Sequence, residues 1–176
     1  MGYKLKIVML GDFAVGKTSL VNRFVQNIFD EKYLATLGVR ISKKDVEVSA
    51  PDGKKDVSLI LWDLNGADGF HSVLPQYLKG AAGAILVGDL TRRDSMENLP
   101  RHAALYRKEN PTGVILVAFN KTDLLSQAEL KKIGQNGISR PELGSSGTFW
   151  TSAKAESNVQ ALFEAMAAQC ATPRPQ

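Results

Sequence analysis

This chain carries the stretch Gly11-Asp12-Phe13-Ala14-Val15-Gly16-Lys17-Thr18, which fits the pattern G-x-x-x-x-G-K-[ST] of a phosphate-binding loop. The pattern is informative where it joins a strand to a helix, and both are predicted here. Residues 5–10 form an apolar, branched run of strand length before the loop. After the loop, apolar residues recur at helical spacing, namely Leu20, Val21, Phe24 and Val25.

The chemistry of such a loop comes from its backbone. Glycines let the chain wrap closely around a phosphate, so that successive N–H groups and the helix N-terminus point at the anion. Lys17 adds a positive charge for the outer phosphates, and the Thr18 hydroxyl is a ligand for Mg²⁺. The alternative is a turn with a chance Lys-Thr pair, and the flanking strand and helix argue against it. The sequence therefore predicts a protein that binds a nucleoside triphosphate.

Bulk properties place the chain among soluble globular proteins. Its 176 residues suit one domain with a sizeable core. The formal net charge is +4, but the basic residues are scattered as pairs, which favours a solvated surface over a nucleic-acid-binding face. The single cysteine, Cys170, cannot form an internal disulfide, and the sequence shows neither a signal peptide nor an apolar stretch of membrane-spanning length. We therefore expect a cytoplasmic protein.

Strand-like runs alternate with helical patterns along the rest of the chain. Extended or apolar segments are predicted at residues 39–41, 46–48, 57–62, 84–88, 114–119 and 148–151. Pro51-Asp52-Gly53 is predicted to turn the second of these segments into the third. The alternation implies a doubly wound α/β sheet whose ligand binds outside the carboxyl ends of the strands.

The helix ends are less well marked. After residues 84–88, Asp94 and Glu97 have the spacing of a capping box, but Pro100 falls inside the helical pattern. Either the helix kinks at Pro100 or it begins near Asn98. Residues 126–133 predict a short helix at most, and residues 134–147 predict a glycine-rich loop. Finally, Ser157 and Gln160 are expected to cap a last helix, with Cys170 packed in the core.

Asp63 ends the apolar run at residues 57–62. An aspartate at a strand end is, by itself, more often a turn former. Opposite a phosphate-binding loop, however, it lies where such proteins need a carboxylate on the Mg²⁺ side. We therefore predict that Asp63 and Thr18 belong to one metal site.

Two motifs that follow buried strands indicate the base, namely Asn120-Lys121-Thr122-Asp123 and Ser152-Ala153-Lys154. The Asp123 carboxylate can accept hydrogen bonds from the ring N–H and the exocyclic amine of guanine. Adenine has no ring N–H at that edge, so such a site discriminates by roughly 10⁴-fold or more. Lys121 is expected to lay its stem along the purine, and Asn120 to tie this loop to the phosphate-binding loop.

These motifs, with Thr36 and Trp62-Asp63-Leu64-Asn65-Gly66, resemble the Ras-superfamily small GTPases in order and spacing, from about Leu5 to Cys170. Residues 36–39 and the Ser-Ala-Lys motif are most similar to the Rab and Ras branches. The resemblance implies an α/β P-loop NTPase fold, with a six-stranded, mostly parallel sheet surrounded by helices. It implies a small G domain over residues 1–170 with a short tail at 171–176. It also implies Mg²⁺-dependent binding of GTP or GDP, and switch segments that meet protein effectors and regulators.

The resemblance also assigns roles to residues. Thr36 would ligand Mg²⁺ in the GTP state, Asp63 would hold it through water, and Gly66 would donate its N–H to the γ-phosphate. Phe29 would pack against guanine, and Tyr33 would cover the phosphates. The predicted catalytic residues are Lys17, Thr36 and Gly66, and the predicted metal ligands are Thr18, Thr36 and Asp63. The predicted nucleotide contacts are Asp12, Phe13, Ala14, Val15, Gly16, Lys17, Thr18, Ser19, Phe29, Tyr33, Thr36, Gly66, Asn120, Lys121, Asp123, Ser152, Ala153 and Lys154.

Two residues depart from the family pattern. Ala67 stands where the family usually has a glutamine that orients the attacking water, and a methyl group can neither donate nor accept a hydrogen bond. Phe13 stands where the family usually has glycine or a small polar residue, so its ring is expected over the γ-phosphate or in the path of an arginine finger. Asp68 and His71 are alternatives for orienting water, although an exposed switch residue is the commoner role.

The predicted function is a guanine-nucleotide switch with slow, Mg²⁺-dependent GTP hydrolysis. The alternative is a scaffold that binds GTP or GDP and barely hydrolyses GTP. A nucleic-acid-binding GTPase is the weaker third reading, because no basic module follows the core. Residues 36–41 and 70–77 are expected to form the effector surface. We expect no stable membrane anchor, since Cys170 lacks the C-a-a-X spacing and Lys6 breaks the myristoylation pattern.

Overall fold

The computed structural model of the chain describes residues 3–30, 38–50, 53–64, 74–135 and 141–172. Within these ranges, one sheet has the strand order β2-β3-β1-β4-β5-β6. β2 and β3 pair as an antiparallel hairpin, and all other neighbouring strands are parallel. This confirms the predicted mostly parallel α/β sheet. The strands are β1 (Tyr3–Leu10), β2 (Val39–Ala50), β3 (Gly53–Leu64), β4 (Gly83–Asp89), β5 (Val114–Asn120) and β6 (Thr148–Trp150).

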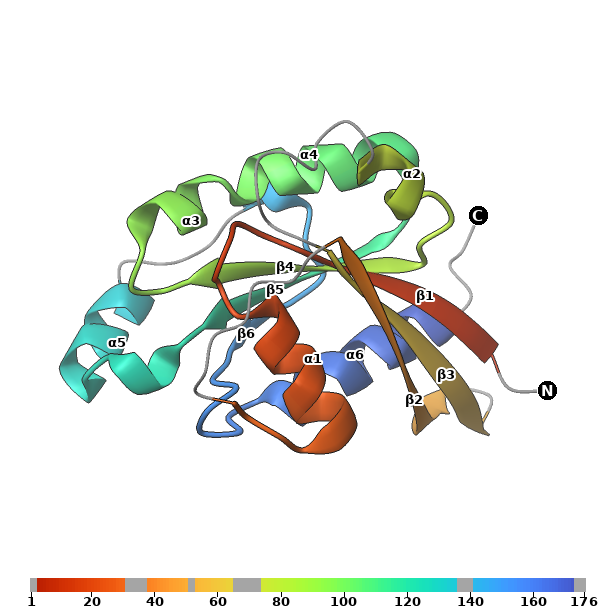
Figure 1. Ribbon diagram of the computed structural model, residues 1–176, viewed down its shortest axis with the longest axis horizontal. Helices are drawn as coiled ribbons and strands as arrows, with labels where there is room; N and C mark the ends of the chain where they lie inside the picture. Colours follow the sequence, from red (N-terminus) through yellow and green to blue (C-terminus); the bar gives the residue numbers. More distant parts are fainter. Residues whose placement is uncertain (1–2, 31–37, 51–52, 65–73, 136–140, 173–176) are drawn as a thin grey trace.

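Helices cover both faces of the sheet (Figure 1). α1 (Lys17–Gln26) and α6 (Val159–Ala171) lie on one face. The other face carries α2 (Leu74–Leu78), α3 (Arg93–Glu97) and α4 (Leu99–Glu109). α5 (Gln127–Gln135) follows the carboxyl end of β5, after the 3₁₀ turn η2 (Thr122–Leu124), and a second turn, η3 (Pro141–Leu143), precedes β6.

Two apolar layers explain why the strands form. Every residue of β4 and β5 is buried, because helices pack on both faces of these central strands. In β1, Ile7 and Met9 belong to the core under α1 and α6, whereas Val8 belongs to the core under α4, as alternation along a strand requires. Phe24 of α1 and Phe163 of α6 stack in the first core, with ring centroids 4.2 Å apart.

The segment after β4 resolves the alternatives at Pro100. α3 ends at Glu97 and α4 begins at Leu99, with Pro100 in the first turn of α4, so the second helix begins next to Asn98. The predicted capping box of Asp94 is wrong. Arg92 holds the N-cap position of α3, and no side chain caps that end.

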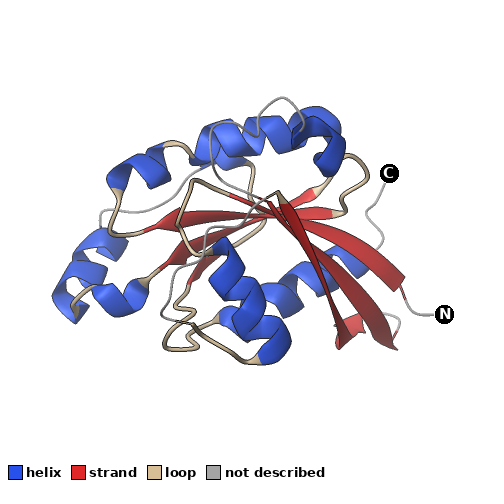
Figure 2. Cartoon of the chain, in the orientation of Figure 1, coloured by secondary structure: helices blue, strands red, loops and turns tan. Residues whose placement is uncertain are grey.

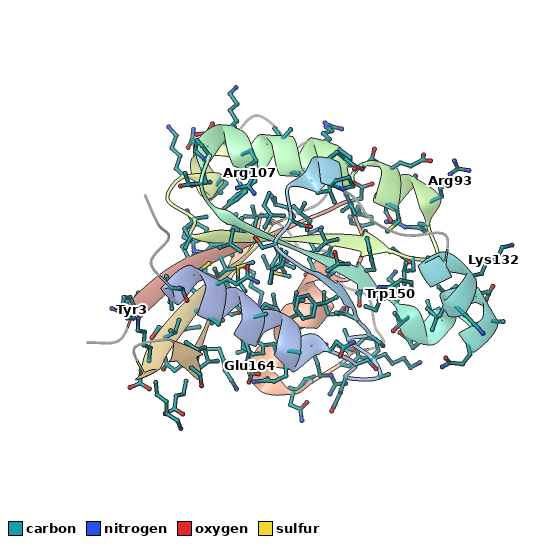
Figure 3. The ribbon with its side chains drawn as sticks, turned by 180° about the vertical axis from the view of Figure 1, so that it is seen from behind. Tyr3, Arg93, Arg107, Lys132, Trp150 and Glu164 are labelled. Atoms are coloured by element: carbon teal, nitrogen blue, oxygen red, sulfur yellow. The ribbon has the colours of Figure 1, made fainter. Side chains whose placement is uncertain are left out.

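Two other predicted helix ends are also wrong. α6 begins at Val159 after Asn158, which has a left-handed backbone (φ 55°) and makes no side-chain cap. Gln160 instead donates to Glu164 along the helix at 2.7 Å. α5 continues to Gln135, so Gly134 belongs to a helix that was expected to stop at residue 133. The view from behind shows α6 along the sheet, with Glu164 on its outer side (Figure 3).

Two further observations concern the helices. Cys170 is half-buried against the core under α6, near the Met166 sulfur (3.5 Å), as the sequence predicted. No helix within the described ranges combines the length and the apolar character needed to cross a membrane.

Candidate nucleotide-binding site

The predicted motifs meet at one end of the sheet. The loops that follow β1, β4 and β5 lie on the same side of the molecule, beside the N-terminus of α1 (Figure 2). Asp63, near the end of β3, is the register partner of Met9 in β1, so it also lies at this end. Parallel strands place their carboxyl ends together, which is why motifs far apart in the sequence converge here.

Two glycines permit the close packing of the phosphate-binding loop. A Cβ on Gly11 would lie 2.2 Å from the Val87 carbonyl oxygen, and one on Gly16 would lie 2.3 Å from Nδ2 of Asn120. Both glycines also have positive φ, at 146° and 102°. A side chain at either position would force apart the loop and a neighbouring strand.

Side chains hold the carbonyl groups along the loop. Lys17 Nζ donates to the carbonyls of Gly11 (2.8 Å) and Asp12 (2.7 Å). The next three carbonyls each accept from a different side chain. Arg92 donates to Phe13 (2.7 Å), Lys121 to Ala14 (2.9 Å) and Asn120 to Val15 (3.0 Å). These donors fix the carbonyl groups of residues 11–15, and the prediction that the loop N–H groups bind a phosphate stays a prediction.

Lys17 is buried at the start of α1. Burial lowers its pKa to about 8, although the nearby Asp63 and Asp12 oppose the change. The pKa of its ammonium group therefore lies closer to neutral pH than that of an exposed lysine.

Thr18 and Asp63, the two residues predicted to belong to one metal site, are in contact. The Thr18 hydroxyl donates to Oδ2 of Asp63 at 2.5 Å, and Asp63 is fully buried. A hydroxyl and a carboxylate in contact are oxygen donors of the kind that Mg²⁺ takes, usually with water and phosphate completing its shell. The donor set therefore fits Mg²⁺. Among the described residues, no group of three or more His, Cys, Asp or Glu side chains could hold a metal ion.

Asn120 links the base motif to the phosphate-binding loop, as predicted. Its side chain donates to the Val15 carbonyl and accepts from the Thr151 hydroxyl at 3.1 Å. Lys121 bonds the Ala14 carbonyl and forms an ion pair with Asp89 at 2.7 Å. The loop after β5 is thus fastened to residues 14 and 15.

Asp89 was missed by the sequence analysis. Its burial would raise the pKa of its carboxyl, but hydrogen bonds from Lys121 and Thr91 outweigh burial and lower that pKa. Asp89 ends β4 as Asp63 nearly ends β3, so the rule that selected Asp63 would also have found it.

Asp123 and Ser152, which belong to the two motifs expected to meet the base, are in contact. The Ser152 hydroxyl donates to Oδ1 of Asp123 at 2.6 Å, while Asp123 itself is exposed at the surface. Arg23 of α1 donates to the Ala153 carbonyl at 2.8 Å and pairs with Glu156 at 2.5 Å. α1 therefore supports both the phosphate-binding loop and the loop expected to meet the base.

The remaining predicted residues divide into two groups. Phe29 is half-buried against the core beside α1, Ser19 is half-buried in α1, and Lys154 is exposed. Tyr33, Thr36 and Gly66, with Ala67, Asp68 and His71, lie outside the described residues.

A second group that sequence reasoning missed surrounds Asp12. Asn98 Nδ2 donates to Asp12 Oδ2 at 2.7 Å, and His102 Nε2 lies 2.8 Å from Asp12 Oδ1. These contacts span 86 and 90 residues of sequence, so no local signal could have revealed them. Burial would raise the pKa of Asp12, but the hydrogen bonds from Asn98 and His102 outweigh it and lower that pKa.

The chain is similar to known proteins over most of its length. The model of the Ras family matches residues 6–172. Ras-related protein Rab-31 of Rattus norvegicus is 34% identical over 169 residues, which cover 94% of this chain and 83% of the rat protein. Rab-31 of Mus musculus is 34% identical over 176 residues, covering 98% of this chain and 86% of the mouse protein. Rab-31 of Homo sapiens is 34% identical over 169 residues, which cover 94% of this chain and 83% of the human protein.

Proposed function

This chain belongs to the Ras family of small GTPases and is a GTP-binding molecular switch, and we propose that it hydrolyses GTP slowly. The observation that carries the slow rate is Ala67, the residue after Gly66. Phosphoryl transfer to water depends on positioning the water and offsetting charge, and a glutamine usually performs the first task in such enzymes. A methyl group leaves that task unfilled.

Phosphates are proposed to lie against the N–H groups of residues 11–18 and beside Lys17. Thr18 and Asp63 would hold Mg²⁺, with Thr36 joining them in the GTP state. When bound, the ion would offset charge on the phosphates. The contact between the Thr18 hydroxyl and the Asp63 carboxylate supports this assignment, because it places two oxygen ligands next to each other.

The base is proposed to be guanine, read by Asp123. The exposed carboxylate of Asp123, held by Ser152, supports this reading because it can accept both donors on the pairing edge of guanine. Ala153 would donate its N–H to the guanine carbonyl. Arg23 supports that role, since it holds the carbonyl on the other side of the same residue.

Phe13 is the second feature that favours a slow rate. Phe13 is 43% exposed, whereas Val15 of the same loop is fully buried. We infer that the ring lies near the terminal phosphate and hinders an arginine supplied by an activating protein. Effectors and regulators are proposed to bind residues 36–41 and 70–77.

Single-turnover release of phosphate from the preloaded GTP complex tests the proposal. We expect slow release from the wild type and faster release from Ala67→Gln, because a positioned group that assists water contributes about 10²–10⁴-fold. Phe13→Gly combined with Ala67→Gln should give a larger, non-additive gain. Ala67→Met is the matched control, since methionine has the length of glutamine without its amide.

Two outcomes would contradict slow hydrolysis by a switch lacking a water-orienting group. Fast release from the wild type, with no gain in Ala67→Gln, would show that another residue orients the water, and Asp68 and His71 would be tested next. Tight GTP binding without release in any variant would favour the scaffold function instead.

A further inference from the structure

We propose that Asn98 and His102 are positioning residues that hold the phosphate-binding loop through Asp12 and thereby slow nucleotide release. The inference goes beyond the proposed slow hydrolysis, because it concerns how long the nucleotide stays bound. It rests on the contacts of two side chains with a single carboxylate.

The contacts use both oxygens of Asp12. Asn98 donates to Oδ2 at 2.7 Å, and His102 meets Oδ1 at 2.8 Å. Asn98 and His102 are four residues apart at the start of α4, a spacing that places them on the same side of a helix. The carboxylate is therefore fixed in both position and rotation.

The side chain of Asn98 bonds Asp12 and not the helix that begins beside it. Asn98 holds the N-cap position of α4, where an asparagine usually accepts a hydrogen bond from the first turn, yet its side chain makes no cap. Its amide reaches Asp12 instead.

His102 acts as a neutral donor. A carboxylate only accepts hydrogen bonds, so Nε2 of His102 must carry the proton that faces Asp12. Nδ1 is buried and has no hydrogen-bond partner among the described residues, and a proton there would be an unpaired buried N–H. Burial lowers the pKa of His102 and the positive Lys17 and Arg101 add to this, while Asp12 opposes it.

The position of Asp12 also affects Lys17, the residue proposed to meet the outer phosphates. Its carbonyl accepts from Lys17 Nζ at 2.7 Å, so the residue held by α4 also sets the position of the lysine that meets the outer phosphates. The next carbonyl, that of Phe13, is held by Arg92 at 2.7 Å. If Asp12 moves, the position of Lys17 changes with it, and bound nucleotide should leave faster.

The test is the dissociation rate of a fluorescent GDP analogue, measured with Mg²⁺ and excess unlabelled GDP. We expect His102→Leu and Asn98→Ala to release the analogue about tenfold faster, as the loss of a hydrogen bond to a charged group would produce. His102→Gln should stay near the wild-type rate, because the glutamine amide nitrogen is as many bonds from the backbone as Nε2 of histidine. Lys108→Ala, at an exposed position of α4, is the control.

A double-variant cycle separates positioning from general stability. In the Asp12→Ala background, His102→Leu should have no further effect on release, since its partner is already absent. Equal rates for His102→Leu, His102→Gln and wild type would overturn the proposal, as would a full effect of His102→Leu without Asp12. If His102→Leu does not fold, Asn98→Ala, which changes an exposed residue, decides the question in the same way. Hydrolysis enters none of these rates, so this inference and the proposed slow hydrolysis can fail independently.

Discussion

Lys17 shows how a buried charge depends on its ligand. In this protein, burial lowers its pKa to about 8 against the opposing effect of Asp63 and Asp12. A bound phosphate would raise that pKa again, because an opposite charge favours the protonated amine. Nucleotide binding should therefore take up a proton at pH values above about 8.

The affinity for GDP should therefore fall at high pH. Affinity for GDP should be fully present below pH 8 and should fall as the pH rises through 8, by up to about tenfold for each unit. Lys17→Arg should show no such fall, since a guanidinium stays protonated throughout this range. Affinity from association and dissociation rates at pH 7, 8 and 9 would check this, and a flat profile for the wild type would contradict it.

At the scale of elements, helix ends were the least predictable feature. Ser126 and Glu129 cap α5 reciprocally: the Ser126 N–H donates to the Glu129 carboxylate at 2.7 Å, and the Glu129 N–H donates back to the Ser126 hydroxyl at 3.3 Å. Asp94, which had a similar spacing to Glu97, caps nothing. The spacing of the two residues does not by itself show which pair forms a cap. The first residue of the pair must also lie directly before the helix, whereas Asp94 lies inside α3.

The α5 cap gives a stability prediction. Ser126→Ala should lower the free energy of unfolding by about 1 kcal/mol, because α5 would lose a partner for its first N–H groups. Gln127→Ala, at the next exposed position, should change it by less than about 0.5 kcal/mol. Urea unfolding of the nucleotide-bound protein measures both. A loss of equal size in the two variants would show that the cap is not its cause.

In the molecule as a whole, a bound nucleotide should contact loops that follow several different strands. The loop between β1 and α1, Asp63 of β3, and the loops after β5 and β6 all contribute to the candidate site. A ligand that binds the folded chain alone stabilises it by an amount that grows with ligand concentration over Kd. GDP and a non-hydrolysable GTP analogue should therefore both raise the Tm.

Thr36→Ala should separate the Tm increase caused by GDP from that caused by the GTP analogue. Since Thr36 is proposed to meet Mg²⁺ only in the GTP state, the variant should keep the Tm increase from GDP and lose part of the increase from the analogue. A tenfold weaker Kd would remove about 1.4 kcal/mol of stabilisation. The check is thermal unfolding of wild type and Thr36→Ala with each nucleotide and Mg²⁺. Equal losses with both nucleotides would mean that Thr36 does not sense the γ-phosphate.

The fold class and the main residues of the candidate site could be predicted from the sequence alone. Residues 11–18, Asp63, Asn120 and Asp123 were all identified in advance, and the structure brings them together. Each belongs to a short motif at the end of a buried apolar strand. Parallel strands carry their carboxyl ends to one edge, so the strand pattern was enough to predict that these motifs meet.

The side chains that hold the phosphate-binding loop from outside could be identified only in the folded structure. Asn98 and His102 reach Asp12 across 86 and 90 residues, and Arg92 reaches the Phe13 carbonyl. A polar residue at the start of a helix favours a cap when only its neighbours are considered, as for Asn98. Its actual partner depends on which loop the packed sheet and helices place within hydrogen-bonding distance, and that is a property of the folded chain as a whole.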